Sequence, residues 1–145
     1  MTGPSARAWI DGGARGNPGD AGYGVLFEGP DGTEEICGFL GRTTNNVAEY
    51  AAAIAALSYA RHLGVERLEV FSDSQLLVRQ VSGEYKVKSA HLVPLFLQIL
   101  TLRRGLAEFR IRHVPREENK EADRLANRAI DQRAPNPAWM DLPAG

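Results

Sequence analysis

Four carboxylates of this chain stand at the ends of apolar runs or on their buried side, where a lone charge is costly to desolvate. They are Asp11, Glu49, Asp73 and Asp123. Most of them have no Lys or Arg beside them in sequence, so each must find its partner through the fold. A shared divalent cation would neutralise them together, and ligation by oxygen alone favours a hard ion, Mg²⁺ or Mn²⁺. The fold must therefore bring four distant segments to one place.

The order of apolar runs and chain breakers predicts an α/β domain on a mixed sheet. Three strands come first and form an antiparallel meander, with a Pro-Asp-Gly turn between the second and the third. Later strands alternate with helices, and such crossovers make them parallel to the first strand. The expected strands are 6–11, 22–28, 35–40, 68–72 and 109–113, and the expected helices are 46–63, 74–81, 92–102 and 122–130. Asn45 or Asn46 is expected to cap the first helix, and Gly64 to end it.

This order of elements predicts where the four acids lie. Asp11 and Asp73 fall at the carboxyl ends of two strands, and ligands of such sheets bind beyond these ends. Glu49 lies about one turn into the first helix, and Asp123 lies early in the last helix. The four side chains are therefore expected to converge on one patch.

Length and composition fit one domain with a core of its own. The chain has 145 residues, 43% of them hydrophobic and 24% charged, with a net charge of −1, which by itself does not suggest nucleic-acid binding. Cys37 is the only cysteine, so an internal disulfide is excluded. The start lacks an apolar signal region and no run could span a bilayer, so we expect a cytoplasmic protein. Prolines beyond Ala134 divide the chain into a domain over 1–133 and an irregular tail over 134–145.

Four motifs, found in order between about Ala6 and Ile130, resemble those of type 1 ribonuclease H. They are Asp11-Gly12-Gly13 followed by Gly16-Asn17-Pro18-Gly19, Arg42-Thr43-Thr44-Asn45-Asn46 before Glu49, Ser72-Asp73-Ser74, and His113 ten residues before Asp123 with Asn119 between them. Each motif is weak alone, but four at suitable spacing make coincidence improbable. The resemblance implies a ribonuclease H-like fold, a five-stranded mixed sheet with helices on both faces. The segment Gly83–Ser89 resembles the branch of the family that lacks a basic protrusion.

The resemblance also implies an activity. The chain would be a metal-dependent endonuclease that hydrolyses the RNA strand of RNA–DNA hybrids and leaves 5′-phosphate and 3′-hydroxyl ends. Two Mg²⁺ ions, with Mn²⁺ as the alternative, would bind between the four acids, and Asp11 would bridge them. Asp123 would complete the site that activates water, and Glu49 with Asp73 the leaving-group site. His113 would lie on a mobile loop and assist proton transfer or product release.

By the same resemblance, the substrate-binding residues flank the acids. They are Gly12, Gly13, Asn17, Arg42, Thr44, Asn45, Asn46, Ser74, Lys86 and Lys88. Those nearest the acids would contact the 2′-hydroxyl that distinguishes RNA from DNA, while Arg42 and the two lysines would meet phosphates. The expected partner is the hybrid alone, with no membrane, no obligate protein partner and a monomeric chain.

Two other functions remain open at this point. A 3′–5′ exonuclease of the same broad fold usually carries Asp-x-Glu on its first strand, whereas this chain has Asp11-Gly12-Gly13. A hybrid-binding module that has lost catalysis would be expected to lack one of the acids, and none is missing. A simple cap is the more ordinary role of Asn45-Asn46, and a solvated edge is as ordinary as a binding patch for the two lysines.

Overall fold

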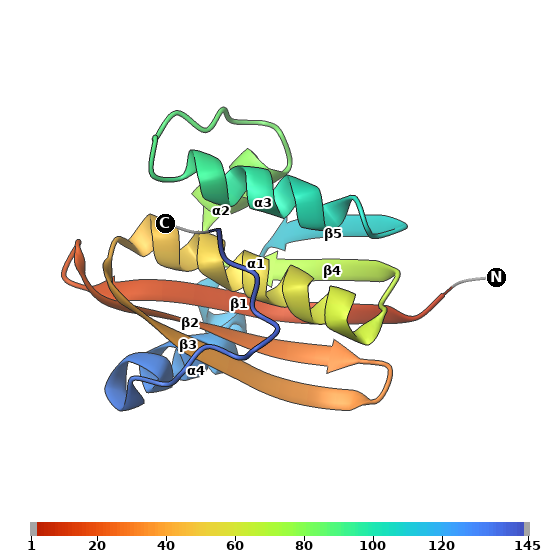
Figure 1. Ribbon diagram of the computed structural model, residues 1–145, viewed down its shortest axis with the longest axis horizontal. Coiled ribbons are helices and arrows are strands. Elements are labelled where there is room, and N and C mark those ends of the chain that lie inside the picture. Colours follow the sequence, from red (N-terminus) through yellow and green to blue (C-terminus); the bar gives the residue numbers. More distant parts are fainter. Residues whose placement is uncertain (1–2, 144–145) are drawn as a thin grey trace.

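A five-stranded mixed sheet with the order β3-β2-β1-β4-β5 forms the centre of the computed structural model, which describes residues 3–143 (Figure 1). The strands are β1 Ser5–Arg15, β2 Gly19–Gly29, β3 Gly32–Thr43, β4 Arg67–Ser72 and β5 Glu108–His113. The helices are α1 Asn45–Leu63, α2 Gln75–Val81, α3 Val93–Arg103 and α4 Lys120–Gln132, with a short 3₁₀ turn at Arg116–Glu118. The predicted fold class and order of elements are confirmed.

The first strand is longer than predicted, and this changes where Asp11 lies. Strand β1 runs parallel to β4 only as far as the pair of Ile10 with Ser72. It continues to Arg15 because antiparallel β2 still supplies hydrogen-bonding partners there. Asp11 is therefore inside β1 rather than at its end, one residue beyond the last pair with β4. Because the pairing of β1 with β4 ends at Ile10, Asp11 still lies beyond the end of the parallel pair, as predicted for a ligand-binding residue.

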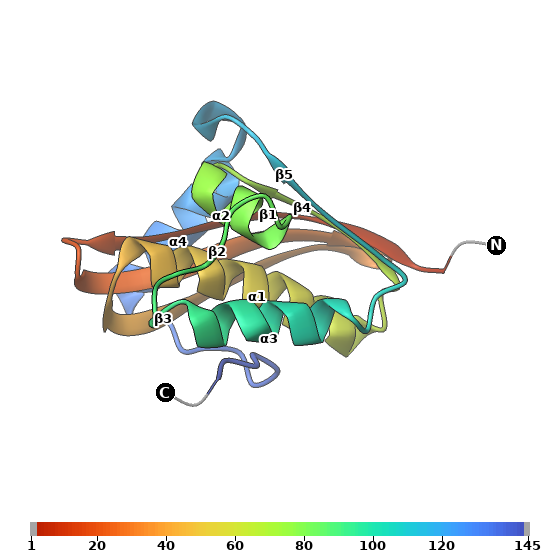
Figure 2. The ribbon, with the colours of Figure 1, turned by 90° about the horizontal axis from the view of Figure 1, so that it is seen from above.

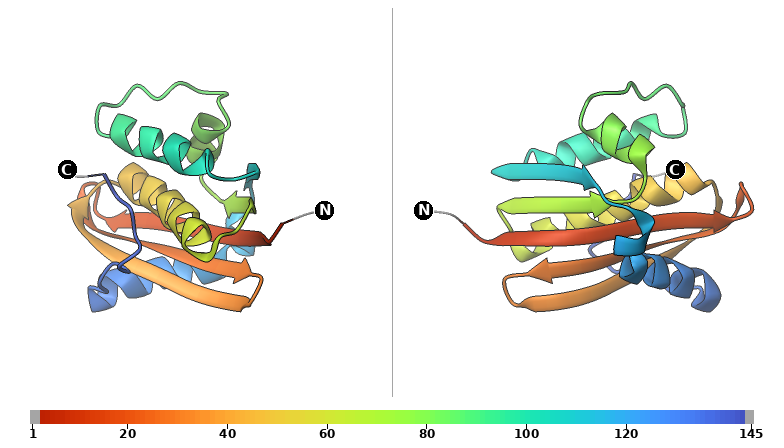
Figure 3. Two further views of the ribbon diagram at one scale, coloured as in Figure 1. Left: turned by 45° about the vertical axis from the view of Figure 1, so that its right-hand side comes forward. Right: turned by 180° about the vertical axis from the view of Figure 1, so that it is seen from behind.

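Helices cover both faces of the sheet, as expected. Helices α1, α2 and α3 lie on one face, and α4 crosses β1, β2 and β3 on the other, where it is seen in front of the sheet from behind (Figure 3). Viewed from above, α1 lies between the sheet and α3 (Figure 2). This position explains the alanine-rich sequence of α1, which is buried on nearly all sides, because small side chains let both neighbours approach.

The N-cap of α1 differs from the prediction. Thr44, and not Asn45 or Asn46, caps the helix, and its hydroxyl accepts a hydrogen bond from the Val47 amide at 3.2 Å. Asn45 is used elsewhere, as described below. The helix ends at Gly64, whose φ of 73° confirms the predicted stop. Pro94 lies in the first turn of α3, where its missing amide hydrogen does no harm.

The chain beyond α4 has neither helix nor strand as far as Pro143, and it lies against β3 and α1. The Ala134 carbonyl accepts a hydrogen bond from the Phe39 amide at 2.8 Å, and Trp139 packs on Tyr59 with ring centroids 4.9 Å apart. The division into a domain and a tail stays a prediction, and its first two and last two residues lie outside the described part. Among residues 3–143, no helix is long and apolar enough to cross a membrane.

Candidate active site

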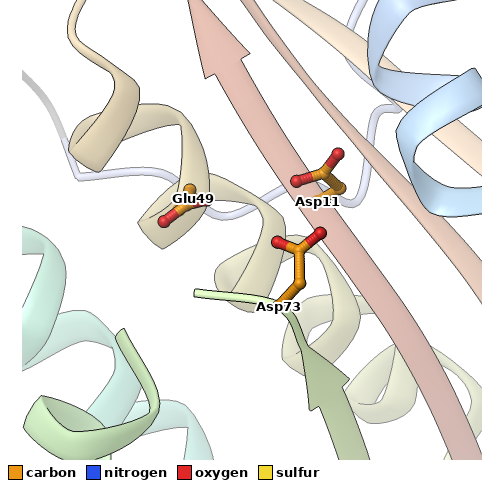
Figure 4. Close-up of side chains that lie close together, drawn as sticks. All are labelled: Asp11, Glu49 and Asp73. Carbon is orange, nitrogen blue, oxygen red and sulfur yellow. The ribbon is translucent and has the colours of Figure 1, made fainter. Parts of the chain in front are cut away.

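Three of the four acids meet beside the point where β1 and β4 part. Oxygen atoms of Asp11, Glu49 and Asp73 all lie within 4.8 Å of one another. Figure 4 shows the three side chains coming from β1, from α1 and from the chain just after β4. The three acids are far apart in sequence but form a single cluster, because the crossover from β3 through α1 to β4 brings them together.

Gly12 allows this cluster to form. A Cβ atom at Gly12 would stand 2.2 Å from the Ala48 carbonyl oxygen and 2.6 Å from the Glu49 amide nitrogen. Both of these are backbone atoms, so they cannot swing away as a side chain could. The absence of a side chain lets β1 touch the first turn of α1 and brings Asp11 next to Glu49. At Gly13 a Cβ would meet only the Asn45 Oδ1 at 3.9 Å.

Burial, together with the charges of neighbouring acids, raises the pKa of two of the acids. Burial, followed by the charges of Asp73, Asp123 and Glu49 and a hydrogen bond with Asp123, raises the pKa of Asp11 to about 8. Burial, with a smaller contribution from Asp73, raises the pKa of Glu49 to about 7. Without a cation these carboxylates oppose each other's ionisation, which is the electrostatic condition that a bound metal relieves.

Asp123 stands at the exposed rim of the cluster. It lies near the start of α4, and its side chain reaches Asp11 without joining the tight group of three. Helix α4 can approach β2 closely because Gly24 has no side chain, since a Cβ there would lie 2.5 Å from backbone atoms of Ala122 and Ala126. Two glycines thus set the depth at which the two acid-bearing helices sit on the sheet.

Arg116 and Ser74 both favour the ionised form of Glu49. Arg116 lies in the 3₁₀ turn, with its Nε 4.0 Å from Asp73 Oδ2, and its positive charge lowers the pKa of Glu49. Ser74 hydrogen-bonds to Glu49, which also lowers that pKa, and its hydroxyl caps α2 by accepting from the Leu77 amide. Ser74 was predicted as a substrate contact, and the structure gives it these two roles beside the acids.

The two predicted contacts Asn17 and Asn45 tie the β1–β2 hairpin to α1. Asn45 Oδ1 accepts a hydrogen bond from the Ala14 amide at 2.7 Å, and the Asn45 amide donates to Asn17 Oδ1 at 3.1 Å. They therefore fix the rim of the cleft, and Thr44 caps the helix beside them. Arg42 and Asn46 are exposed next to this rim.

The remaining predicted residues lie further out. Lys86 and Lys88 are exposed on the segment between α2 and α3. His113 is exposed as the last residue of β5, in register with Ser72, so the expectation that it lies on a loop is wrong. The strand places it next to the end of β4, from which Asp73 follows, and the loop begins only after it.

A cleft of about 350 Å³ is lined by three of the four acids, by Gly12, Gly13 and Asn45, and by residues that the sequence reasoning missed. Arg15, Arg116 and Asn127 line it together with Asp11, Glu49 and Asp123. Arg15 is held over α4 by an ion pair with Asp131 at 2.5 Å and by a hydrogen bond to Asn127 Oδ1 at 3.3 Å. The only sequence signal for Arg116 is its position between His113 and Asp123, and Arg15 has none beyond lying near motif residues. Asn127 ends the Leu125-Ala126-Asn127 stretch of the last motif but was not predicted as a site residue.

The donor set of the cluster fits a hard divalent cation. The three clustered ligands are carboxylates, and no histidine or cysteine joins them in the described part of the chain. Carboxylate oxygens suit Mg²⁺ and Mn²⁺, and such an ion would favour the ionised forms of Asp11 and Glu49, whose pKa values burial and neighbouring acids raise.

Comparison with known proteins agrees with this geometry. A family model described as "Reverse transcriptase-like" matches residues 10–129. The bifunctional protein Rv2228c of Mycobacterium tuberculosis is 44% identical over 92% of this chain, which spans only 38% of that relative's length. A ribonuclease H of Methylococcus capsulatus is 33% identical over 90% of this chain and 92% of its own.

Among solved structures, LC11-RNase H1 in complex with an RNA/DNA hybrid superposes with a TM-score of 0.82 and 42% identity. That match covers 88% of this chain and 97% of the other. Fold, acid cluster and relatives therefore agree, and the chain belongs to the type 1 ribonuclease H family.

Proposed function

We propose that this chain is an endonuclease that hydrolyses the RNA strand of RNA–DNA hybrids and leaves 5′-phosphate and 3′-hydroxyl ends. The observation that carries the proposal is the convergence of Asp11, Glu49 and Asp73 within 4.8 Å, with Asp123 beside Asp11. A hybrid-binding module would not need four acids in this costly arrangement. The hybrid-bound relative of the same fold supports the choice of substrate.

The proposed cofactor is Mg²⁺, two ions per substrate complex, with Mn²⁺ as the alternative. Asp11 would be shared between them, Asp123 would complete one site, and Glu49 with Asp73 would complete the other. Bound there, the ions would supply the positive charge that a phosphodiester needs during hydrolysis.

The protein groups around the acids orient and hold the site. Ser74 and Arg116 keep Glu49 closer to its ionised form, in which it can bind a cation. Asn45 and Asn17 fix the hairpin next to the acids, and the open space at Gly13 leaves its backbone free for close approach of a sugar. His113, exposed at the end of β5, is the proposed residue for assisting proton transfer or product release.

The deciding experiment compares the cleavage of four labelled substrates that share one sequence. They are an RNA–DNA hybrid, single-stranded RNA, duplex RNA and duplex DNA. We expect cleavage of the hybrid only, dependent on Mg²⁺ or Mn²⁺ and lost in EDTA. The Asp11→Asn variant is the matched control for contaminating nucleases. Cleavage that survives in this variant, or equal cleavage of single-stranded RNA, would contradict the proposal.

The cytoplasmic location, the monomeric state and the absence of an obligate protein partner stay predictions from the sequence. The monomer is testable by light scattering with and without hybrid. Only the hybrid enters the proposal as a partner.

A further inference from the structure

A buried glutamine joins the helix that carries Glu49 to the cationic segment between α2 and α3. Gln80, near the end of α2, is 6% exposed, and both ends of its amide have protein partners. Its Oε1 accepts a hydrogen bond from the Tyr50 hydroxyl at 2.6 Å, and its Nε2 donates to the Lys86 carbonyl at 3.4 Å. Tyr50 directly follows Glu49 and is itself 1% exposed.

The segment Gly83–Ser89 needs such anchors, because it has neither helix nor strand (Figures 1 and 3). The amides of Glu84 and Tyr85 both donate to the Arg79 carbonyl, and the Arg79 guanidinium lies 5.3 Å from the centre of the Tyr85 ring. These contacts hold the first half of the segment. Further along, the side chain of Val87 packs on the core, and the hydrogen bond from Gln80 fixes the backbone of Lys86 itself.

We propose that Gln80 is a positioning residue that holds Lys86 and Lys88 in register with the catalytic acids. The inference rests on the proposed function, in which these lysines meet phosphates of the hybrid. Two exposed cations on an irregular segment bind a duplex well only if they are held in place beforehand, because ordering them on binding reduces affinity. The path from Glu49 through Tyr50 and Gln80 to Lys86 has two hydrogen bonds, of which the first is buried and the second part-buried.

A buried glutamine of purely structural importance would stabilise the fold without acting on substrate binding. The two roles differ in their dependence on the lysines. If Gln80 acts through Lys86 and Lys88, its replacement changes hybrid binding only while those side chains are present. If it is structural, its replacement changes stability, and any effect on binding is the same with or without the lysines.

The test uses Gln80→Met in a Tyr50→Phe background, so that neither replacement leaves a buried polar partner of the other unpaired. Tyr50→Phe alone is the reference, since it retains the bond to Lys86. Because it leaves Gln80 Oε1 without the Tyr50 hydroxyl, the free energy of unfolding of both proteins is measured beside KM. We expect an increase in KM for the hybrid of about fivefold, the value of one net hydrogen bond, with kcat within about twofold. Trypsin should also cleave after Lys86 and Lys88 faster than in the reference protein.

The same pair is then compared in a Lys86→Ala, Lys88→Ala protein, where we expect no further change in KM. An unchanged KM in the first comparison, or an equal increase in the second, would overturn the positioning role. Gln80→Leu serves as a second replacement if the methionine variant does not fold. Hybrid affinity in EDTA, measured by fluorescence anisotropy, separates the two proposals. A protein that binds the hybrid in EDTA but does not cleave it with Mg²⁺ or Mn²⁺ refutes the proposed function, and its affinity still tests Gln80.

Discussion

Asp11 is a carboxylate whose ionisation the folded protein opposes. The pKa of Asp11 is raised to about 8 by burial and by its acidic neighbours, against an ordinary value near 4. Between those two pH values the folded state holds a proton that the unfolded state has released. The metal-free protein must therefore lose stability as pH rises through this window, and Glu49, with a pKa of about 7, acts in the same direction.

The first prediction follows from that sign. Asp11→Asn removes a cluster charge, so turnover should vanish, while the metal-free variant should match or exceed the wild type in melting temperature at pH 8, by roughly 5 °C. Melting in EDTA at pH 5, 7 and 8 measures this. Asp31→Asn, in the exposed β2–β3 turn, is the matched control and should follow the wild type at every pH. A variant that is less stable at pH 8 than at pH 5 by as much as the wild type would refute the argument.

Gly12 gives a second test at the level of one residue. Gly12→Ala forces a methyl group to within 2.2 Å of the Ala48 carbonyl oxygen, so β1 and α1 must separate. We expect a loss of roughly 1–3 kcal/mol in the free energy of unfolding, measured by urea titration, together with weaker hybrid cleavage. Gly13→Ala, with only a contact at 3.9 Å, should stay within about 0.5 kcal/mol of wild type. Equal stability of the two variants would show that the close approach is not needed.

At the scale of elements, the segment Gly83–Ser89 carries two of the predicted phosphate contacts, Lys86 and Lys88. Its cations are few, so its contribution to affinity should depend on salt. We expect Lys86→Ala with Lys88→Ala to raise KM for the hybrid and to flatten the log–log salt slope by up to about 0.9 for each lost phosphate contact, with kcat nearly unchanged. Cleavage rates over a salt series, with Arg104→Ala at the exposed end of α3 as the control, measure both effects. A lower kcat at constant KM would assign the segment to catalysis.

The elements also show what a sequence can and cannot reveal. The strands, the stop of α1 at Gly64 and the place of Pro94 were predictable, because apolar periodicity, glycine and proline act locally. The cap of α1 was predicted wrongly, because Thr44 and Asn45 are both good caps and the choice depends on a distant partner. The Asn45 side chain bonds to the Ala14 amide on another strand, and that contact exists only in the folded chain.

The candidate site divides in the same way. Four acids in motif context predicted a cluster, and three of them meet within 4.8 Å. Arg116, which is close to Asp73 in space but 43 positions away by the difference of the two residue numbers, carries no local signal of its role. The same holds for Gln80, an ordinary helix residue in sequence whose meaning lies in its contacts with Tyr50 and Lys86.

At the scale of the whole molecule, the chain beyond α4 closes the structure over two elements. Asn136 accepts a hydrogen bond from the Tyr23 hydroxyl at 2.7 Å and donates to the Phe39 carbonyl at 3.0 Å. Further on, Asp141 pairs with Arg61 of α1 at 2.9 Å. These contacts cover part of edge strand β3 and the outer side of α1, and none of their residues lines the catalytic cleft.

The last prediction is that this closing segment contributes to stability and not to chemistry. Trp139→Ala removes the ring that packs on Tyr59 and should lower the free energy of unfolding by about 1–2 kcal/mol, since the lost contact is large but half-exposed. Trp139→Phe, which retains an aromatic ring at the same place, should recover most of this loss. Below the melting transition kcat and KM for the hybrid should equal those of the wild type in both variants. A Trp139→Ala protein that unfolds like the wild type, or that melts earlier and also has a lower kcat at 25 °C, would show that the segment is either loosely attached or coupled to the active site.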